Sequence, residues 1–126
     1  MVRRVWLDAN FLMLPAQFKV DIFAELERVI EEPFELLAPS GVLGELGNVS
    51  AGRGIDAAAA RVALKIAGSG RVKIVQSEGP VDDWLAEKAG EGDVVCTNDL
   101  GLIRRLRGRK VRRVQMVGRS HLGFAR

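Results

Sequence analysis

The chain has 126 residues and a mass of 13.8 kDa, the size of one domain with one core. Hydrophobic residues make up 48% and charged residues 28%, which argues against disorder, and no apolar run reaches the roughly 20 residues of a membrane span. The single cysteine, Cys96, excludes a disulfide framework and a cysteine-rich zinc site, and the opening residues lack the pattern of an export signal. We therefore expect one cytoplasmic domain over residues 1–126, with no membrane partner.

Segments with strand and helix patterns alternate along the chain. In order, the predicted elements are a strand at Val2–Leu7, a helix at Ala16–Glu32, a strand at Phe34–Ala38, a helix opened by Pro39 and Ser40, a helix at Asp56–Ala67, a strand at Arg71–Val75, a helix at Val81–Ala89, a strand at Asp93–Thr97, a helix at Asp99–Leu106 and a strand at Lys110–Val117. This alternation predicts a parallel sheet with helices on both faces, an α/β fold in three α/β/α layers.

Charge is unevenly distributed along the chain. Residues 1–99 contain ten lysines and arginines and all sixteen acids, a formal charge of −6, whereas residues 100–126 contain nine basic residues and no acid, a charge of +9. A basic segment on an acidic body indicates a polyanionic partner, nucleic acid ahead of an anionic membrane, although a solvated basic surface explains the pattern equally well. The basic residues that we expect to contact RNA are Arg104, Arg105, Arg107, Arg109 and Lys110.

Acidic residues follow four successive predicted strands. Asp8 ends the first, Glu45 lies on the helix after the second, Asp82 and Asp83 open the helix after the third, and Asp99 follows the fourth. Because the carboxyl ends of parallel strands share one edge of a sheet, these side chains are expected to meet there. Two like charges about 4 Å apart repel by roughly 4 kcal/mol at an effective dielectric constant near 20, so their assembly requires a cation. Oxygen ligands without a histidine or cysteine cluster suit Mg²⁺ or Mn²⁺, which polarise phosphodiesters and acidify bound water.

Each acid also has an ordinary structural explanation when it is taken singly. Asp8 would close a turn after its strand, and Asp82 and Asp99 would complement helix N-termini. Glu45 would be a solvated helix position, and Asp83 a neighbour of a ligand. The joint placement of the acids makes the metal site the stronger interpretation.

Four segments of the chain resemble, in order, the motifs of PIN domains. They are residues 5–12 (VWLDANFL), 39–46 (PSGVLGEL), 81–85 (VDDWL) and 94–100 (VVCTNDL). Residues 17–23 and the basic run at 103–107 further resemble archaeal PIN proteins, which are akin to rRNA-processing PIN nucleases and to VapC-type toxins. The resemblance covers nearly the whole chain, and its specificity lies in the order of the four motifs.

The resemblance implies a central five-stranded parallel sheet and a Mg²⁺- or Mn²⁺-dependent endoribonuclease. Such an enzyme cleaves single-stranded or structured RNA by attack of metal-activated water on the phosphodiester, in rRNA processing or RNA turnover. Asp8 and Asp99 would bind the metal most directly, Asp82 would contribute directly or through water, and Glu45 would complete the catalytic pocket. Four further residues would orient ligands or substrate, namely Asn10, Asp83, Thr97 and Asn98.

One departure from the family pattern favours an alternative function. Ala9 stands where many PIN domains carry threonine or serine, and the missing hydroxyl removes a support for Asp8. A non-catalytic RNA-binding PIN module that acts as a ribosome-assembly factor is therefore the alternative. A homodimer, an antitoxin partner and a ribosome-assembly partner are all compatible with the family. A phosphoacceptor signalling domain is disfavoured, because the paired acids follow the third strand and not the first.

Overall fold

The computed structural model describes residues 2–126. Its strands are β1 (Arg3–Leu7), β2 (Phe34–Pro39), β3 (Lys73–Val75), β4 (Val94–Cys96), β5 (Arg112–Val117) and β6 (His121–Phe124). Its helices are α1 (Ala9–Phe18), α2 (Ile22–Val29), α3 (Gly41–Ser50), α4 (Ile55–Ala67), α5 (Val81–Lys88) and α6 (Leu100–Leu106). No helix within residues 2–126 is both long and apolar enough to cross a membrane.

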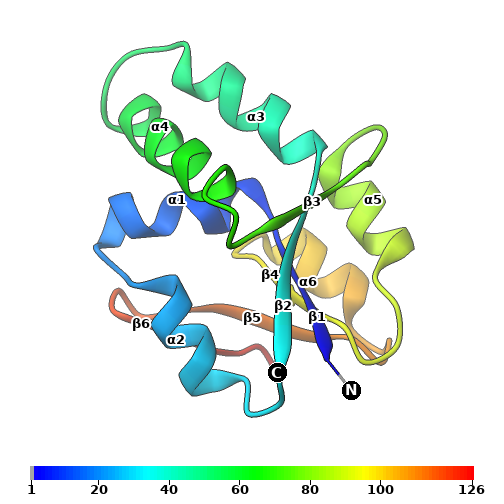
Figure 1. The fold of residues 1–126 in the computed structure, drawn as a ribbon. Helices are drawn as coiled ribbons and strands as arrows, with labels where there is room; N and C mark the ends of the chain where they lie inside the picture. Colours follow the sequence, from blue (N-terminus) through cyan, green and yellow to red (C-terminus); the bar gives the residue numbers. More distant parts are fainter. Residues whose placement is uncertain (1) are drawn as a thin grey trace.

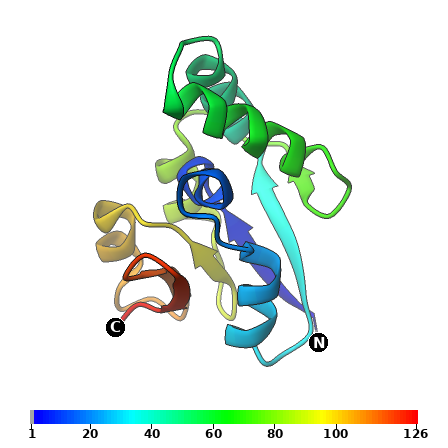
Figure 2. The same ribbon diagram turned by 90° about the vertical axis from the view of Figure 1, so that its left-hand side faces the viewer.

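The strands form one sheet in the order β3-β2-β1-β4-β5-β6, and every neighbouring pair is parallel except β5 and β6. Helices α1 and α2 lie on one side of the strands and α5 and α6 on the other, while α3 and α4 lie beyond the upper ends of β1 and β2 (Figure 1). The side view in Figure 2 shows the same layers turned by 90°. The predicted three-layer α/β/α fold is confirmed.

The antiparallel edge strand β6 extends the predicted five-stranded sheet. The chain reverses after β5 at Gly118, whose φ of 63° lies in the left-handed region that glycine adopts without strain. Leu122 of β6 is 1% exposed and Phe124 pairs with Val114, so the hairpin covers the edge of β5.

The prediction of one helix over Ala16–Glu32 is wrong, because two helices occupy residues 9–29. Asp8 caps α1 and so starts it well before Pro15, which lies inside the helix. Lys19 ends α1 with a φ of 56°, and the Asp21 carboxylate caps α2 by accepting from the backbone N–H groups of its first turn. The two aspartate caps therefore decide the boundaries, ahead of the apolar spacing that runs through both helices.

A buried carboxylate joins β1 to β4 at the amino-terminal ends of the strands. Asp93 accepts hydrogen bonds from Arg4 Nε (3.0 Å), Arg4 Nη2 (2.9 Å), Trp6 Nε1 (3.0 Å) and the Gly90 N–H (2.9 Å). Trp6 is 3% exposed and meets the ring of Trp84 on α5 edge to face, with centroids 5.3 Å apart. These contacts fix the two central strands relative to each other, and so fix the opposite edge, where their carboxyl ends meet.

Candidate active site at the carboxyl ends of the strands

A cavity of about 150 Å³ lies at the carboxyl ends of β1 and β4. It brings together the four acids predicted from the sequence, although they come from the end of β1, from α3, from the start of α5 and from the loop after β4. The residues that line it are Asp8, Ala9, Asn10, Glu45, Pro80, Val81, Asp82 and Asp99. Pro80 and Val81 were not predicted; their position directly before Asp82 was the available signal.

Asp8 is the most buried of the four acids, at 4% exposure. Its Oδ1 accepts from the Phe11 N–H at 2.7 Å, and its Oδ2 accepts from the Thr97 hydroxyl. Burial raises the pKa of Asp8 to about 7, against the opposing effect of these two hydrogen bonds, and the charges of Asp82 and Glu45 raise it further. The fold therefore holds a carboxylate where its negative charge is poorly solvated.

Thr97 links Asp8 to the loop that carries Asp99. Its side chain is fully buried, and its Oγ1 donates to Asp8 while it accepts from the Asp99 N–H at 3.0 Å. Its backbone N–H donates to the Val114 carbonyl at 3.0 Å, so the residue is anchored to β5. Thr97 lies behind Asp8, where it orients the carboxylate without lining the cavity.

Asp99 and Asp82 face each other across the cavity. Asp99 caps α6, and its Oδ1 accepts from the N–H groups of Gly101 (2.8 Å) and Leu102 (3.2 Å). A hydrogen bond with Asp82, together with these backbone donors, lowers the pKa of Asp99. Burial and the nearby Asp99 raise the pKa of Asp82 to about 6. The two carboxyl groups therefore titrate as a pair and share one proton below about pH 6.

Glu45 completes the acidic lining from α3. It is an exposed residue, yet partial burial of its carboxyl group raises its pKa, and a backbone hydrogen bond from Val81 opposes the shift. No lysine or arginine within residues 2–126 lines this cavity. Positive side-chain charge acts on these carboxyl groups from outside the lining, where Arg104 and Arg105 favour the ionised forms of Asp99 and Asp82.

The four predicted supporting residues occupy different positions. Asn10 lines the cavity, and Thr97 lies behind Asp8. Asp83 points away to an ion pair with Arg105 Nη1 at 2.7 Å, and Asn98 accepts from the Met116 N–H at 2.8 Å. The structure therefore places Asp83 and Asn98 outside the cavity, in contacts that hold α6 and β5.

The predicted basic residues are divided between the carboxyl ends and the amino-terminal ends of the strands. Arg104 and Arg105 lie on α6, whose first residue follows Asp99, and the charge of Arg104 helps to lower the pKa of Asp99. Arg109 donates to the carbonyls of Ala86 and Ala89, and Lys110 pairs with Glu91 at 3.3 Å. These last two basic residues line a separate cavity at the amino-terminal ends of the strands.

The cavity that contains Asp8, Glu45, Asp82 and Asp99, which we call the acidic cavity, offers a set of ligand atoms that fits a hard divalent cation. Its lining offers carboxylate and amide oxygens from Asp8, Asn10, Glu45, Asp82 and Asp99, which are the ligands that Mg²⁺ and Mn²⁺ prefer. No three His, Cys, Asp or Glu side chains of the described chain are arranged to hold a metal as they stand. The carboxylates are thus neighbours around a space and not a closed ligand cage.

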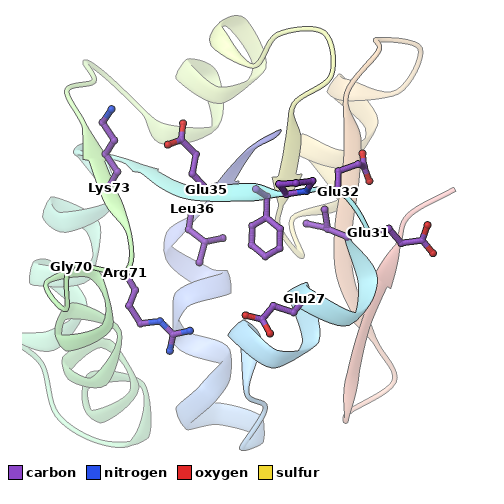
Figure 3. A pocket seen from close by; sticks show the side chains of 11 residues that line it. Glu27, Glu31, Glu32, Glu35, Leu36, Gly70, Arg71 and Lys73 are labelled. Carbon is purple, nitrogen blue, oxygen red and sulfur yellow. The ribbon is translucent and has the colours of Figure 1, made fainter. Parts of the chain in front are cut away.

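A larger cavity, of about 720 Å³, lies elsewhere and contains none of these acids (Figure 3). Its lining includes Glu27 of α2, Glu35 of β2 and Arg71 and Lys73 near β3. We call it the acidic groove. Its size does not make it the active site, because it lacks a convergent set of buried carboxyl groups.

Comparison with known proteins assigns the chain to a family. The family model described as a PIN like domain matches residues 5–119. A solved structure, "Structure of the PIN domain endonuclease Utp24", is similar with a TM-score of 0.81 and 22% identity, over 98% of this chain and 91% of that chain. A UPF0178 protein from Caulobacter sp. (strain K31) is 56% identical over 36 residues, which are 27% of this chain and only 24% of that protein. The matching segment thus spans about a quarter of that relative. The structural likeness establishes the fold.

Proposed function

Because the chain belongs to the PIN-like domain family, we propose that it is a Mg²⁺- or Mn²⁺-dependent endoribonuclease that acts in RNA processing. The observation that carries the proposal is the cavity at the carboxyl ends of the strands, which gathers Asp8, Glu45, Asp82 and Asp99 with no lysine or arginine in its lining. Assembling four carboxyl groups is unfavourable unless a cation compensates them. A fold that does so is therefore suited to bind one.

The residues would divide the work according to how firmly hydrogen bonds hold their carboxyl groups. Asp8 is fixed by Phe11 and Thr97, and Asp99 is fixed by the first turn of α6, so these two carboxylates would be the rigid ligands. Asp82 is half-buried like Asp99, and Glu45 is exposed, but neither caps its own helix, so both would adjust to the cation and its water. A divalent cation bound here supplies Lewis acidity to a phosphodiester oxygen and lowers the pKa of a bound water. Arg104, whose charge acts on Asp99, would hold a phosphate next to it.

The chemistry requires a base and a route for the proton. Hydrolysis breaks the bond between phosphorus and the leaving oxygen while water adds to phosphorus, so one proton leaves the water and the leaving oxygen takes one up. Asp82, with a pKa raised to about 6, is suited to exchange protons near neutral pH. We assign it this role in addition to cation binding.

A circular single-stranded RNA tests the proposal, because only an endonuclease opens a molecule without ends. We expect the circle to be opened with Mn²⁺ or Mg²⁺ and to stay closed with EDTA. In Asp8→Asn and Asp99→Asn, we expect the rate of opening to fall by at least about a hundredfold. Asp56→Asn is the matched control, since Asp56 is an exposed acid in the first turn of α4. A circular DNA of the same sequence measures the preference for RNA.

The outcome separates the enzyme from the non-catalytic alternative. Unchanged opening in both Asp8→Asn and Asp99→Asn would reject the site. Salt-sensitive RNA binding without any metal-dependent opening would instead support an RNA-binding module, which the absence of a hydroxyl at Ala9 favours.

A further inference from the structure

The second cavity lies at the amino-terminal ends of the strands, across the sheet from the four carboxyl groups. It has a volume of about 570 Å³ and is formed where β1, β4 and β5 begin and β6 ends. Its lining contains five cationic side chains, those of Arg3, Arg109, Lys110, Arg112 and Arg113. We call it the basic cavity.

Two carboxylates compensate these five cations only in part. Glu32 accepts from Arg3 Nε at 3.2 Å and from Arg112, and Glu91 pairs with Lys110 at 3.3 Å in an exposed contact. Arg109 donates to two carbonyls and has no carboxylate partner among residues 2–126. Three positive charges therefore remain in excess, and such a concave basic surface attracts anions.

The guanidinium group of Arg113 is incompletely satisfied by the protein. Its Nη2 makes one long contact, 3.4 Å, to the Ala125 carbonyl, and its buried Nε has no protein acceptor within the described chain. A guanidinium group donates to a phosphate through two parallel N–H groups, which a carbonyl does not satisfy. The side chain is therefore better matched to a phosphate than to the partner it has.

An aromatic ring lies beside these cations. Phe124 lines the basic cavity, is 39% exposed, and has the Arg112 Cζ 5.1 Å from its ring centroid. Aromatic rings and arginine planes stack nucleobases in single-stranded nucleic acids without regard to sequence. The basic cavity thus pairs phosphate donors with a stacking surface, the combination that recognises a single strand.

The surrounding charges suggest the direction from which a strand enters. Glu32 also lines the acidic groove of Figure 3, whose other carboxylates would repel phosphate. On the other side, Arg104 lies on α6 and Arg107 directly follows its end, between the loop of Asp99 and the basic cavity, and neither forms an ion pair within residues 2–126. A polyanion is thus guided along α6.

We propose that the basic cavity is a second RNA site, which binds a phosphate and a base of a single-stranded segment far from the cleavage site. Binding there does not require cleavage, so the proposal is tested separately, with EDTA present. The probe is a fluorescent single-stranded RNA of about 20 nucleotides, measured by anisotropy over a series of salt concentrations.

Matched variants isolate the basic cavity. Lys110→Glu is compared with Lys65→Glu, because both lysines are exposed and Lys65 lies on α4. Arg113→Gln is compared with the exposed Arg53→Gln. We expect the two cavity variants to weaken binding about three- to tenfold, and Arg113→Gln to reduce the salt slope by roughly 0.7, while the controls change little.

Amide NMR locates the bound RNA, and two competing ligands, AMP and phosphatidylserine vesicles, test whether the site recognises RNA. RNA is expected to shift the amides of Gly92 and Phe124, and those shifts should be lost in Lys110→Glu, an exposed substitution that leaves the core intact. Unshifted amides, or equal binding by Lys110→Glu and Lys65→Glu, would overturn the proposal. So would AMP binding as tightly as RNA, or binding to phosphatidylserine vesicles in place of RNA. Failure of the cleavage assay alone leaves this binding result unaffected.

Discussion

Replacing Asp8 with asparagine tests whether the fold holds a carboxylate against its preference for water. Asp8 is 4% exposed, and its burial raises its pKa from 3.8 to about 7. Asparagine retains an oxygen for the Phe11 N–H, so the cap of α1 survives. We expect the Asp8→Asn protein to be more stable than the wild type at pH 8 when no divalent cation is present.

The sign follows from proton linkage. The unfolded chain loses the Asp8 proton near pH 4, whereas the folded chain keeps it up to about pH 7. The contribution of Asp8 to folding stability therefore falls as the pH rises through this window and is constant above it. A shift of about three units corresponds to about 4 kcal/mol at most, at 1.36 kcal/mol per unit. Reorientation of the Thr97 hydroxyl toward the new amide offsets part of this, so we expect a gain of about 2–4 kcal/mol.

Urea unfolding measures this difference, with the fluorescence of the buried Trp6 as the signal. The gain should appear at pH 8 in EDTA and vanish near pH 4. Asp99→Asn is the opposite control: the pKa of Asp99 is lowered, so its loss should destabilise the protein at pH 8. Mn²⁺ should narrow the gap by stabilising the wild type more than Asp8→Asn. A variant less stable than the wild type at pH 8, or a gap independent of pH, would refute the reasoning.

Three further predictions concern Thr97 and Asp93, at the two ends of the sheet, and Glu25 on α2. Thr97→Val removes the hydroxyl that donates to Asp8, so metal-dependent RNA cleavage should fall about ten- to hundredfold, as measured on the circular substrate. Asp93→Asn breaks the buried contacts between β1 and β4, so urea unfolding should show a loss of about 2–4 kcal/mol, with the cleavage rate per folded molecule unchanged. Glu25→Gln should destabilise the protein at pH 7 and have little effect near pH 2. Hydrogen bonds from Arg28, on the same helix, and from the Leu122 N–H lower the pKa of Glu25 to about 2. The contribution of Glu25 to stability is therefore present above pH 4.5 and is lost as the pH falls toward 2.

The acidic cavity could be predicted because its geometry depends only on chain direction. Once a strand is assigned, the residue after it must lie at the carboxyl edge, whichever helix follows. Asp8 follows a buried strand directly, Asp99 comes three residues after the end of another, and the structure places both in one cavity. The contact from Thr97 to Asp8 could not be predicted in the same way, because it depends on the register between β1 and β4.

The prediction of a single helix over Ala16–Glu32 was wrong because the Asp21 side chain starts a new helix within a continuous apolar pattern. Apolar residues continue at helical spacing through residues 16–30, yet Asp21 restarts the helix by capping its backbone. Lys19 adopts a positive φ that its residue type does not favour, so no sequence signal marks the end of α1. The hairpin to β6 left a weak signal, since Gly118 follows an apolar strand and precedes a short alternating run.

The division of the basic residues follows from the same geometry that gathers the acids. A helix between parallel strands runs back from the carboxyl edge to the amino-terminal edge, so α6 begins at Asp99 and ends before Arg109. Sequence neighbours in the basic segment are therefore distributed across the whole sheet: Arg104 lies near the carboxyl groups, and Lys110 lies at the far edge. An RNA strand that contacts both Arg104 and Lys110 would cross the face covered by α6. Binding at one of these residues would raise the effective concentration of RNA at the other. Net charge along the sequence thus indicates a polyanion, but only the path of α6 divides the basic residues between the two sites that we propose.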